Sequence, residues 1–160
     1  MNKTNKTNAM RLMDAAKISY RAVEYEYDES DLGGEHVAAV TGMNPDQVFK
    51  TLVARGEKQG ILVFCIPVSC TLDLKKAAHA AGDKKVEMIH MKELLGLTGY
   101  IRGGCSPVGM KKKYPTFMDE TAELYDEIAI SGGALGLQMV LNPLKLMEYA
   151  DITSADLVEY

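Results

Sequence analysis

Apolar and polar residues alternate in short blocks along this chain, and the period of each block predicts its secondary structure. Apolar residues at helical spacing predict helices over 9–17, 36–40, 72–81 and 91–97. Runs rich in β-branched and aromatic residues predict strands over 20–27, 49–55, 61–68, 99–102, 116–118, 127–130 and 137–141. Since strands and helices do not strictly alternate, the sequence predicts a mixed α/β fold of the α+β type.

Capping and turn residues punctuate these blocks. Asn8 is the expected N-cap of the first helix, and Gly42 and Gly82 are expected helix ends. Asn44-Pro45 predicts a further helical turn, and Asn142-Pro143 opens a helix that runs to Ala150.

Two connections matter for the topology. The segment 56–60 is a plausible hairpin between the strands over 49–55 and 61–68, and this pair is expected to be central. Thr153-Ser154-Ala155-Asp156 reads as a capping box that opens a C-terminal helix.

The chain reads as one domain over residues 9–160, preceded by a polar, mobile tail over 1–8. Its 160 residues are 47% hydrophobic, and no repeat or low-complexity linker interrupts them. No apolar run approaches the roughly 18 residues that a membrane span needs, and the start lacks the apolar stretch of a signal peptide. We therefore expect a cytoplasmic protein without a membrane partner.

Lysines gather in clusters although the net charge is −4, a value that argues against a general nucleic-acid binder. The clusters are Lys75-Lys76, Lys84-Lys85 and Lys111-Lys112-Lys113. If they meet in the fold they form a basic face for phosphates; otherwise each is a solvated surface.

The cysteines and histidines indicate no metal site and no cofactor. Three cysteines occur at spacings that match neither a redox pair nor a zinc site, and each histidine lacks a second ligand nearby. Cys105 lies in a glycine-rich context but has no recognisable base near it, and no Ser-His-Asp set can be identified.

Two features carry candidate chemistry. In a strand, Lys50 falls on the same face as Val48 and Leu52, where it is either a snorkelling surface lysine or a buried donor. Gly103-Gly104, before Cys105-Ser106-Pro107, either presents backbone N–H groups to a ligand or simply turns the chain. The second glycine loop, 131–136, lacks the ending of a phosphate loop.

Several spaced motifs together resemble the YbaK/EbsC family, which is related to the editing domain of prolyl-tRNA synthetase. They are Phe49-Lys50-Thr51-Leu52, Leu74-Lys75-Lys76-Ala77-Ala78, Gly99-Tyr100 with 103–109, and Ser131-Gly132-Gly133 with Gly136. The resemblance implies a mixed, barrel-like sheet with flanking helices. It also implies a trans-editing deacylase that removes a wrong amino acid from tRNA, in the first place cysteine from tRNA(Pro), with the substrate thiol attacking its own ester.

The resemblance also implies roles for particular residues. Lys50, Gly103 and Gly104 would be catalytic, and Lys75, Lys76, Lys111, Lys112 and Lys113 would hold tRNA. The substrate would contact Tyr25, Thr51, Ser106, Pro107, Gly132, Gly133 and Gln138. Gly33 and Gln138 depart from the residues that some members have, a phenylalanine and an acidic residue.

Two alternatives stay open at this point. The same chemistry could act on another mischarged tRNA such as alanyl-tRNA(Pro), which would differ only in how the pocket treats the side chain. The chain could instead be a non-catalytic module that binds an amino acid or tRNA, for instance as an accessory to prolyl-tRNA synthetase.

Overall fold

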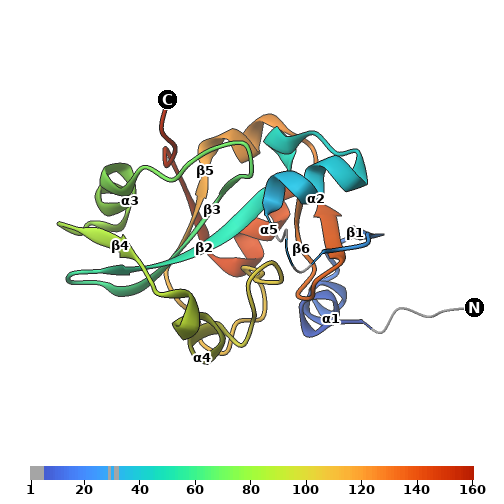
Figure 1. Ribbon diagram of the computed structural model, residues 1–160, viewed down its shortest axis with the longest axis horizontal. Helices are drawn as coiled ribbons and strands as arrows, with labels where there is room; N and C mark the ends of the chain where they lie inside the picture. The colour runs from blue at the N-terminus through green and yellow to red at the C-terminus, as the bar shows by residue number, and fades with distance from the viewer. Residues whose placement is uncertain (1–5, 29, 31–32) are drawn as a thin grey trace, which may run out of the picture.

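Two β-sheets form the centre of the molecule, and helices surround them (Figure 1). The computed structural model describes residues 6–28, 30 and 33–160. The five-stranded sheet has the order β4-β2-β3-β5-β8, and the three-stranded sheet has the order β1-β7-β6. The strands are β1 (Tyr20–Glu24), β2 (Phe49–Gly56), β3 (Gly60–Pro67), β4 (Val86–Met88), β5 (Thr116–Asp119), β6 (Ile128–Ser131), β7 (Leu137–Leu141) and β8 (Ile152–Ala155).

The predicted central hairpin is confirmed. β2 and β3 pair antiparallel from Phe49↔Pro67 to Gly56↔Gly60, so the connection is tight and the register continuous. The carboxylate of Asp83 accepts the backbone N–H groups of Lys58 and Gln59 at the turn. The side chains of this hairpin therefore take fixed positions in the molecule.

The helices are short; each described helix begins at a polar or glycine cap, and all but the first end at one. They are α1 (Asn8–Ala15), α2 (Gly34–Thr41), α3 (Leu74–Ala81), α4 (Leu94–Thr98) and α5 (Pro143–Ala150), with 3-10 turns η1 (Pro45–Gln47), η2 (Met91–Glu93) and η3 (Glu120–Leu124). Gly42 and Gly82 end α2 and α3 in the left-handed conformation, and Asn142 caps α5, as predicted. The cap of α1 is Thr7 rather than Asn8, because the Thr7 hydroxyl accepts the N–H of Met10.

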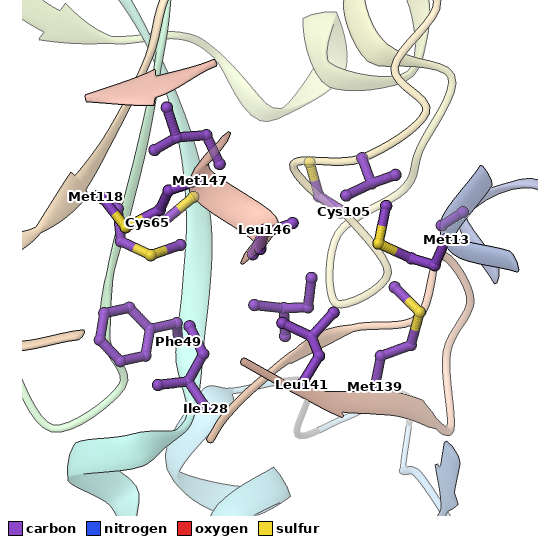
Figure 2. Packing of buried hydrophobic residues seen from close by; sticks show 14 of the residues in the cluster. Met13, Phe49, Cys65, Cys105, Met118, Ile128, Met139, Leu141, Leu146 and Met147 are labelled. Atoms are coloured by element: carbon purple, nitrogen blue, oxygen red, sulfur yellow. The ribbon is translucent and has the colours of Figure 1, made fainter. Parts of the chain in front are cut away.

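The main core lies where the two sheets, α1 and α5 meet (Figure 2). Phe49 and Cys65 come from the five-stranded sheet, Met139 and Leu141 from the three-stranded sheet, and Leu146 from α5. This cluster holds both sheets in place, so that a cavity between them keeps its shape. None of the helices in the described part of the chain combines the length and hydropathy of a membrane span.

The mixed α+β class is confirmed, but the sheets do not close into a barrel. One isolated parallel bridge, Val48↔Ala129, links them within the described residues. Closure would require continuous pairing between β2 and β6, whereas β2 makes its long ladder with β3. The two sheets consequently remain open along the first half of β2.

Four local predictions were wrong or incomplete. Residues 99–102 form no strand, because Gly99 and Gly103 have φ of 85° and 84° and the N–H of Gly104 closes a turn onto the Ile101 carbonyl. The expected C-terminal helix is replaced by β8, which pairs in parallel with β5. Residues Ile152 to Ala155 take the extended conformation because each of them pairs with a residue of β5, from Thr116 to Asp119.

The other two concern strands. β1 ends at Glu24 instead of Tyr27, because pairing with β7 stops at Leu137. The short strand β4 was not predicted; three residues give no periodic signal, and β4 exists through its pairing with the last residues of β2.

Candidate active site

A cavity of about 360 Å³ opens at the unpaired edge of β2. β4 pairs only with Ala54–Gly56, so the first half of β2 lacks a neighbour on that side among the described strands. At an open strand edge, side chains from both faces of the sheet can border one space. The cavity is lined by Gly33, Gly34, Val37, Val48, Phe49, Lys50, Thr51, Leu52, Val53, Val68, Met88, Ile89, Met91, Leu94, Arg102, Gly103, Cys105, Ser131 and Gln138.

Among the residues that the structure describes, Lys50 is the one lysine that lines this cavity. It pairs with Ile66 across the hairpin, is partly buried, and also borders a polar groove formed with Ser69 and Thr71. Within the described part of the chain its ammonium group has no hydrogen bond or ion pair. A cation without a counter-charge at a cavity is suited to bind an oxygen that carries negative charge.

Gln138 lies in the same cavity and is 4% exposed. Its side-chain oxygen Oε1 has no hydrogen-bond partner among the described residues. A buried carbonyl without a donor costs about 1–3 kcal/mol. A ligand that brings an N–H or ammonium group to this oxygen would recover that free energy.

Thr51 and Cys105 also line the cavity, and neither is an activated nucleophile. The Thr51 hydroxyl lies 3.8 Å from Sγ of the buried Cys65. Burial raises the pKa of the Cys105 thiol to about 12, although a hydrogen bond with Thr98 lowers it. The thiol is therefore protonated at neutral pH, and the thiolate that nucleophilic attack requires is scarce.

The first glycine loop is divided between the cavity and the protein interior. Gly103 lines the cavity, whereas the N–H of Gly104 is already bonded to the Ile101 carbonyl. Ser106 is fully buried, where its hydroxyl accepts the N–H of Val108. Pro107 borders a separate depression. Of these predicted site residues, the structure brings only Gly103 to Lys50.

Gly132 and Gly133 of the second glycine loop, and Tyr25, do not line the cavity. The carbonyl of Gly132 accepts the Thr7 hydroxyl at 2.6 Å, and the N–H of Gly133 is bonded to the Ser131 hydroxyl. Tyr25 packs on the hydrophobic cluster that includes Val37 and Val48 rather than lining the cavity itself. These residues support the wall, while Ser131 and Gln138 face the cavity.

Some lining residues were missed by sequence reasoning. Gly34 is the first residue of α2, and Arg102 directly precedes Gly103. Met88 is the last residue of β4, and Met91 begins the 3-10 turn that follows. The Gly33-Gly34 pair was a usable sequence signal. The methionines carried none, because their place depends on the unpredicted pairing of β4 with β2.

The lysine clusters lie on separate segments of the chain. Lys75 and Lys76 belong to α3, while 111–113 follows α4, and the two regions are apart in Figure 1. Lys76 is occupied within the protein: its Nζ donates to Asp156 at 3.1 Å and to the Val158 carbonyl at 2.7 Å.

The remaining clustered lysines are exposed: Lys75, Lys84, Lys85, Lys111, Lys112 and Lys113. Over the described ranges no group of three or more His, Cys, Asp or Glu side chains is arranged to hold a metal ion.

This chain is similar in sequence and in structure to known proteins. The chain is 46% identical over 156 residues to the proposed Cys-tRNA(Pro)/Cys-tRNA(Cys) deacylase EbsC of Enterococcus faecalis (strain ATCC 700802 / V583), covering 94% of this chain and 95% of that protein. The solved structure of a proposed trans-editing enzyme for prolyl-tRNA synthetase superposes with a TM-score of 0.80 at 28% identity, covering 92% of each chain.

A second solved structure, of the protein APE2540, has a TM-score of 0.84 at 22% identity, covering 93% of this chain and 97% of that one, and it shows the shared fold alone. Residues 33–149, which include the whole cavity, match the family described as the aminoacyl-tRNA editing domain. With this match and a close relative along nearly its whole length, the chain belongs to the aminoacyl-tRNA editing domain family.

Proposed function

We propose that this protein is a trans-editing deacylase that hydrolyses the ester of a mischarged aminoacyl-tRNA, with cysteinyl-tRNA(Pro) as its substrate. The observation that carries the proposal is the cavity at the open edge of β2. Lys50, whose ammonium group has no counter-charge, and Gln138, whose side-chain oxygen has no hydrogen-bond partner, both line this cavity. Among the described residues, no activated nucleophile lines it. The relationship to EbsC supports this substrate.

The amino-acid end of the substrate is proposed to lie in the depth of the cavity. Its α-ammonium group donates to Oε1 of Gln138, which relieves the unsatisfied carbonyl. The ester carbonyl lies beside Lys50, whose Nζ stabilises the developing oxyanion. The N–H of Gly103 is a second candidate donor, since it makes no backbone hydrogen bond within the described part of the chain.

The substrate supplies the nucleophile in this proposal. The thiol sulfur of the cysteinyl group bonds to its own ester carbon, the bond from that carbon to the ribose oxygen breaks, and the thiol proton passes to this leaving oxygen. The products are tRNA with a free terminal hydroxyl and a cyclic thioester of cysteine, which water opens to free cysteine. Thr51, Ser131 and Cys105, which line the cavity with hydroxyl and thiol groups, need form no covalent bond.

This mechanism predicts which substrates are cleaved. Purified protein should clear cysteinyl-tRNA(Pro) and spare seryl-tRNA and alanyl-tRNA(Pro), because a hydroxyl is a weaker nucleophile than a thiol and a methyl group is none. The measurement is single-turnover deacylation of the three charged tRNAs, with and without a chelator. Equal rates on cysteinyl- and seryl-tRNA, or loss of activity with the chelator, would contradict the mechanism.

The same panel separates the alternatives. Faster clearance of alanyl-tRNA(Pro) would identify a different edited amino acid, and tRNA binding without turnover would identify a binding module. We also propose that the protein acts in the cytoplasm on tRNA released by prolyl-tRNA synthetase. Adding that synthetase to the assay should raise the rate if the two proteins associate.

A further inference from the structure

Two methionines and an arginine at the mouth of the cavity take no part in the proposed chemistry. Met88 and Met91 line the cavity but are 43% and 57% exposed, whereas Cys105 and Gln138 in its depth are 8% and 4% exposed. Arg102 also lines the mouth and is exposed. We call Met88, Met91 and Arg102 the mouth wall.

The two methionines of the mouth wall are fixed to the strand that carries Lys50. Met88 pairs with Ala54 of β2, and the N–H of Ile89 donates to the Val53 carbonyl at 3.3 Å. The turn that carries Met91 is closed by Glu93, whose carboxylate accepts the N–H of His90 and forms an ion pair with Arg55 at 2.8 Å. The methionines are therefore held at the mouth by backbone pairing and a capped turn.

The chemistry of the mouth wall suits a flat aromatic ring. Thioether groups make favourable contacts with aromatic rings, and an arginine side chain can stack on a nucleobase. The guanidinium group of Arg102 has no ion pair among the described residues. Gly33 and Gly34, which also line the cavity, offer no side chain on which a ring could stack.

The covalent structure of an aminoacyl-tRNA determines what reaches this wall. The amino acid is esterified to one side of the terminal ribose, and the adenine base projects from another side. When the ester lies at Lys50 with the amino acid toward Gln138, the base must emerge at the mouth. We infer that the mouth wall binds the adenine of the 3′-terminal nucleotide of tRNA by stacking on Met88, Met91 and Arg102.

This inference rests on the proposed function for the identity of the ligand, but binding can be measured without turnover. The probe is an acceptor-stem RNA hairpin that ends in adenosine, compared with the same hairpin ending in an abasic residue. In fluorescence anisotropy at fixed salt, the parent protein should bind the adenosine-ended RNA about five- to tenfold more tightly.

The variant that tests the wall is Met88→Ala combined with Met91→Ala. It should lose most of this preference while its affinity for the abasic RNA stays unchanged. Met91→Phe should retain the preference, because an aromatic ring also stacks. The matched control is Leu144→Ala, which truncates a side chain on α5 that is 56% exposed and does not line the cavity.

Two results would overturn the inference. The first is equal binding of the two RNAs by the parent protein. The second is a double variant that melts like the parent and keeps the adenosine preference. That result would mean that the base binds elsewhere, for example in the groove of Ser69 and Thr71. Absence of deacylation by the parent would contradict the proposed function alone, since the adenosine preference is measured without it.

Discussion

At the scale of single residues, Lys50 and Gln138 have no partners that satisfy their polar groups within the described part of the protein. Lys50 lacks a counter-charge there, and Oε1 of Gln138 lacks a donor. Folded proteins pair nearly all of their buried polar groups, so the unpartnered Oε1 of Gln138, in one cavity with a partly buried lysine that lacks a counter-charge, indicates a place prepared for a ligand.

Replacing Lys50 tests this interpretation. Lys50→Ala should lower the single-turnover deacylation rate by about a hundredfold or more, if the ammonium supplies an oxyanion contact of about 3 kcal/mol. Lys50→Arg should not restore full activity, because a planar guanidinium is wider than an ammonium group. Both variants should melt close to the parent, since Lys50 makes no internal ion pair within the described residues.

The matched control is Lys58→Ala, which removes an exposed lysine side chain from the β2–β3 turn. It should leave both rate and melting temperature unchanged. A Lys50→Ala variant that is well folded and turns over at the parental rate would show that Lys50 is only a snorkelling side chain.

At the scale of elements, the cavity depends on the close approach of α2 to the end of the hairpin. Gly34 begins α2, and a Cβ at this position would meet Cγ1 and Cβ of Val68, the latter at 2.8 Å. Both Gly34 and Val68 line the cavity. A helix with any other residue at position 34 would have to move outward and change the cavity wall.

Gly34→Ala should therefore destabilise the protein and reduce deacylation, because the clash outweighs the gain in helix propensity of up to about 1 kcal/mol. Gly96→Ala is the matched control: Gly96 also lies in a helix, α4, but a Cβ there meets nothing within 4 Å. That variant should be as stable as the parent or more so. Thermal melts and deacylation rates of both variants check the prediction, and equal behaviour of the two would contradict the packing argument.

At the scale of the whole molecule, the exposed lysines are candidate ligands for the phosphates of the tRNA body. Changing Lys111, Lys112 and Lys113 together to Ala should weaken tRNA binding at low salt. It should also lower the salt slope by about 0.7 to 0.9 for each phosphate that the variant no longer neutralises. The decrease in the salt slope should be smaller than the value for three lost phosphate contacts, because Nζ of Lys113 already forms an ion pair with the carboxylate of Asp151 at 3.6 Å.

Lys75 and Lys76 provide the comparison for this measurement. Lys75→Ala should act on tRNA affinity alone if Lys75 binds a phosphate. Lys76→Ala should lower stability as well, because it removes the interactions with Asp156, the Val158 carbonyl and the ring of Tyr160. Binding titrations over a salt series, with melting curves, separate the two effects; unchanged affinity in every variant would exclude these clusters as tRNA-binding sites.

Features with local causes were determined by the sequence itself. The β2–β3 hairpin, the glycine ends of α2 and α3 and the cap of α5 follow from propensities and hydrogen bonds within a few residues. Lys50, Thr51, Gly103 and Gln138, named through the family resemblance, all line the cavity.

Tertiary structure decided the features that depend on residues far apart in the chain. Gly104 and Ser106 face inward because the loop uses their polar groups for its own turns, which no spacing reveals. Residues Ile152–Ala155, which include most of a sequence that resembles a helix capping box, form a strand because they pair with β5. β4 pairs with only three residues of β2, so half of β2 has no partner strand on that side among the described residues. The cavity lies at that unpaired edge, where side chains from both faces of the sheet can line one space. Residues of α2 and of the segment after β4 complete its lining.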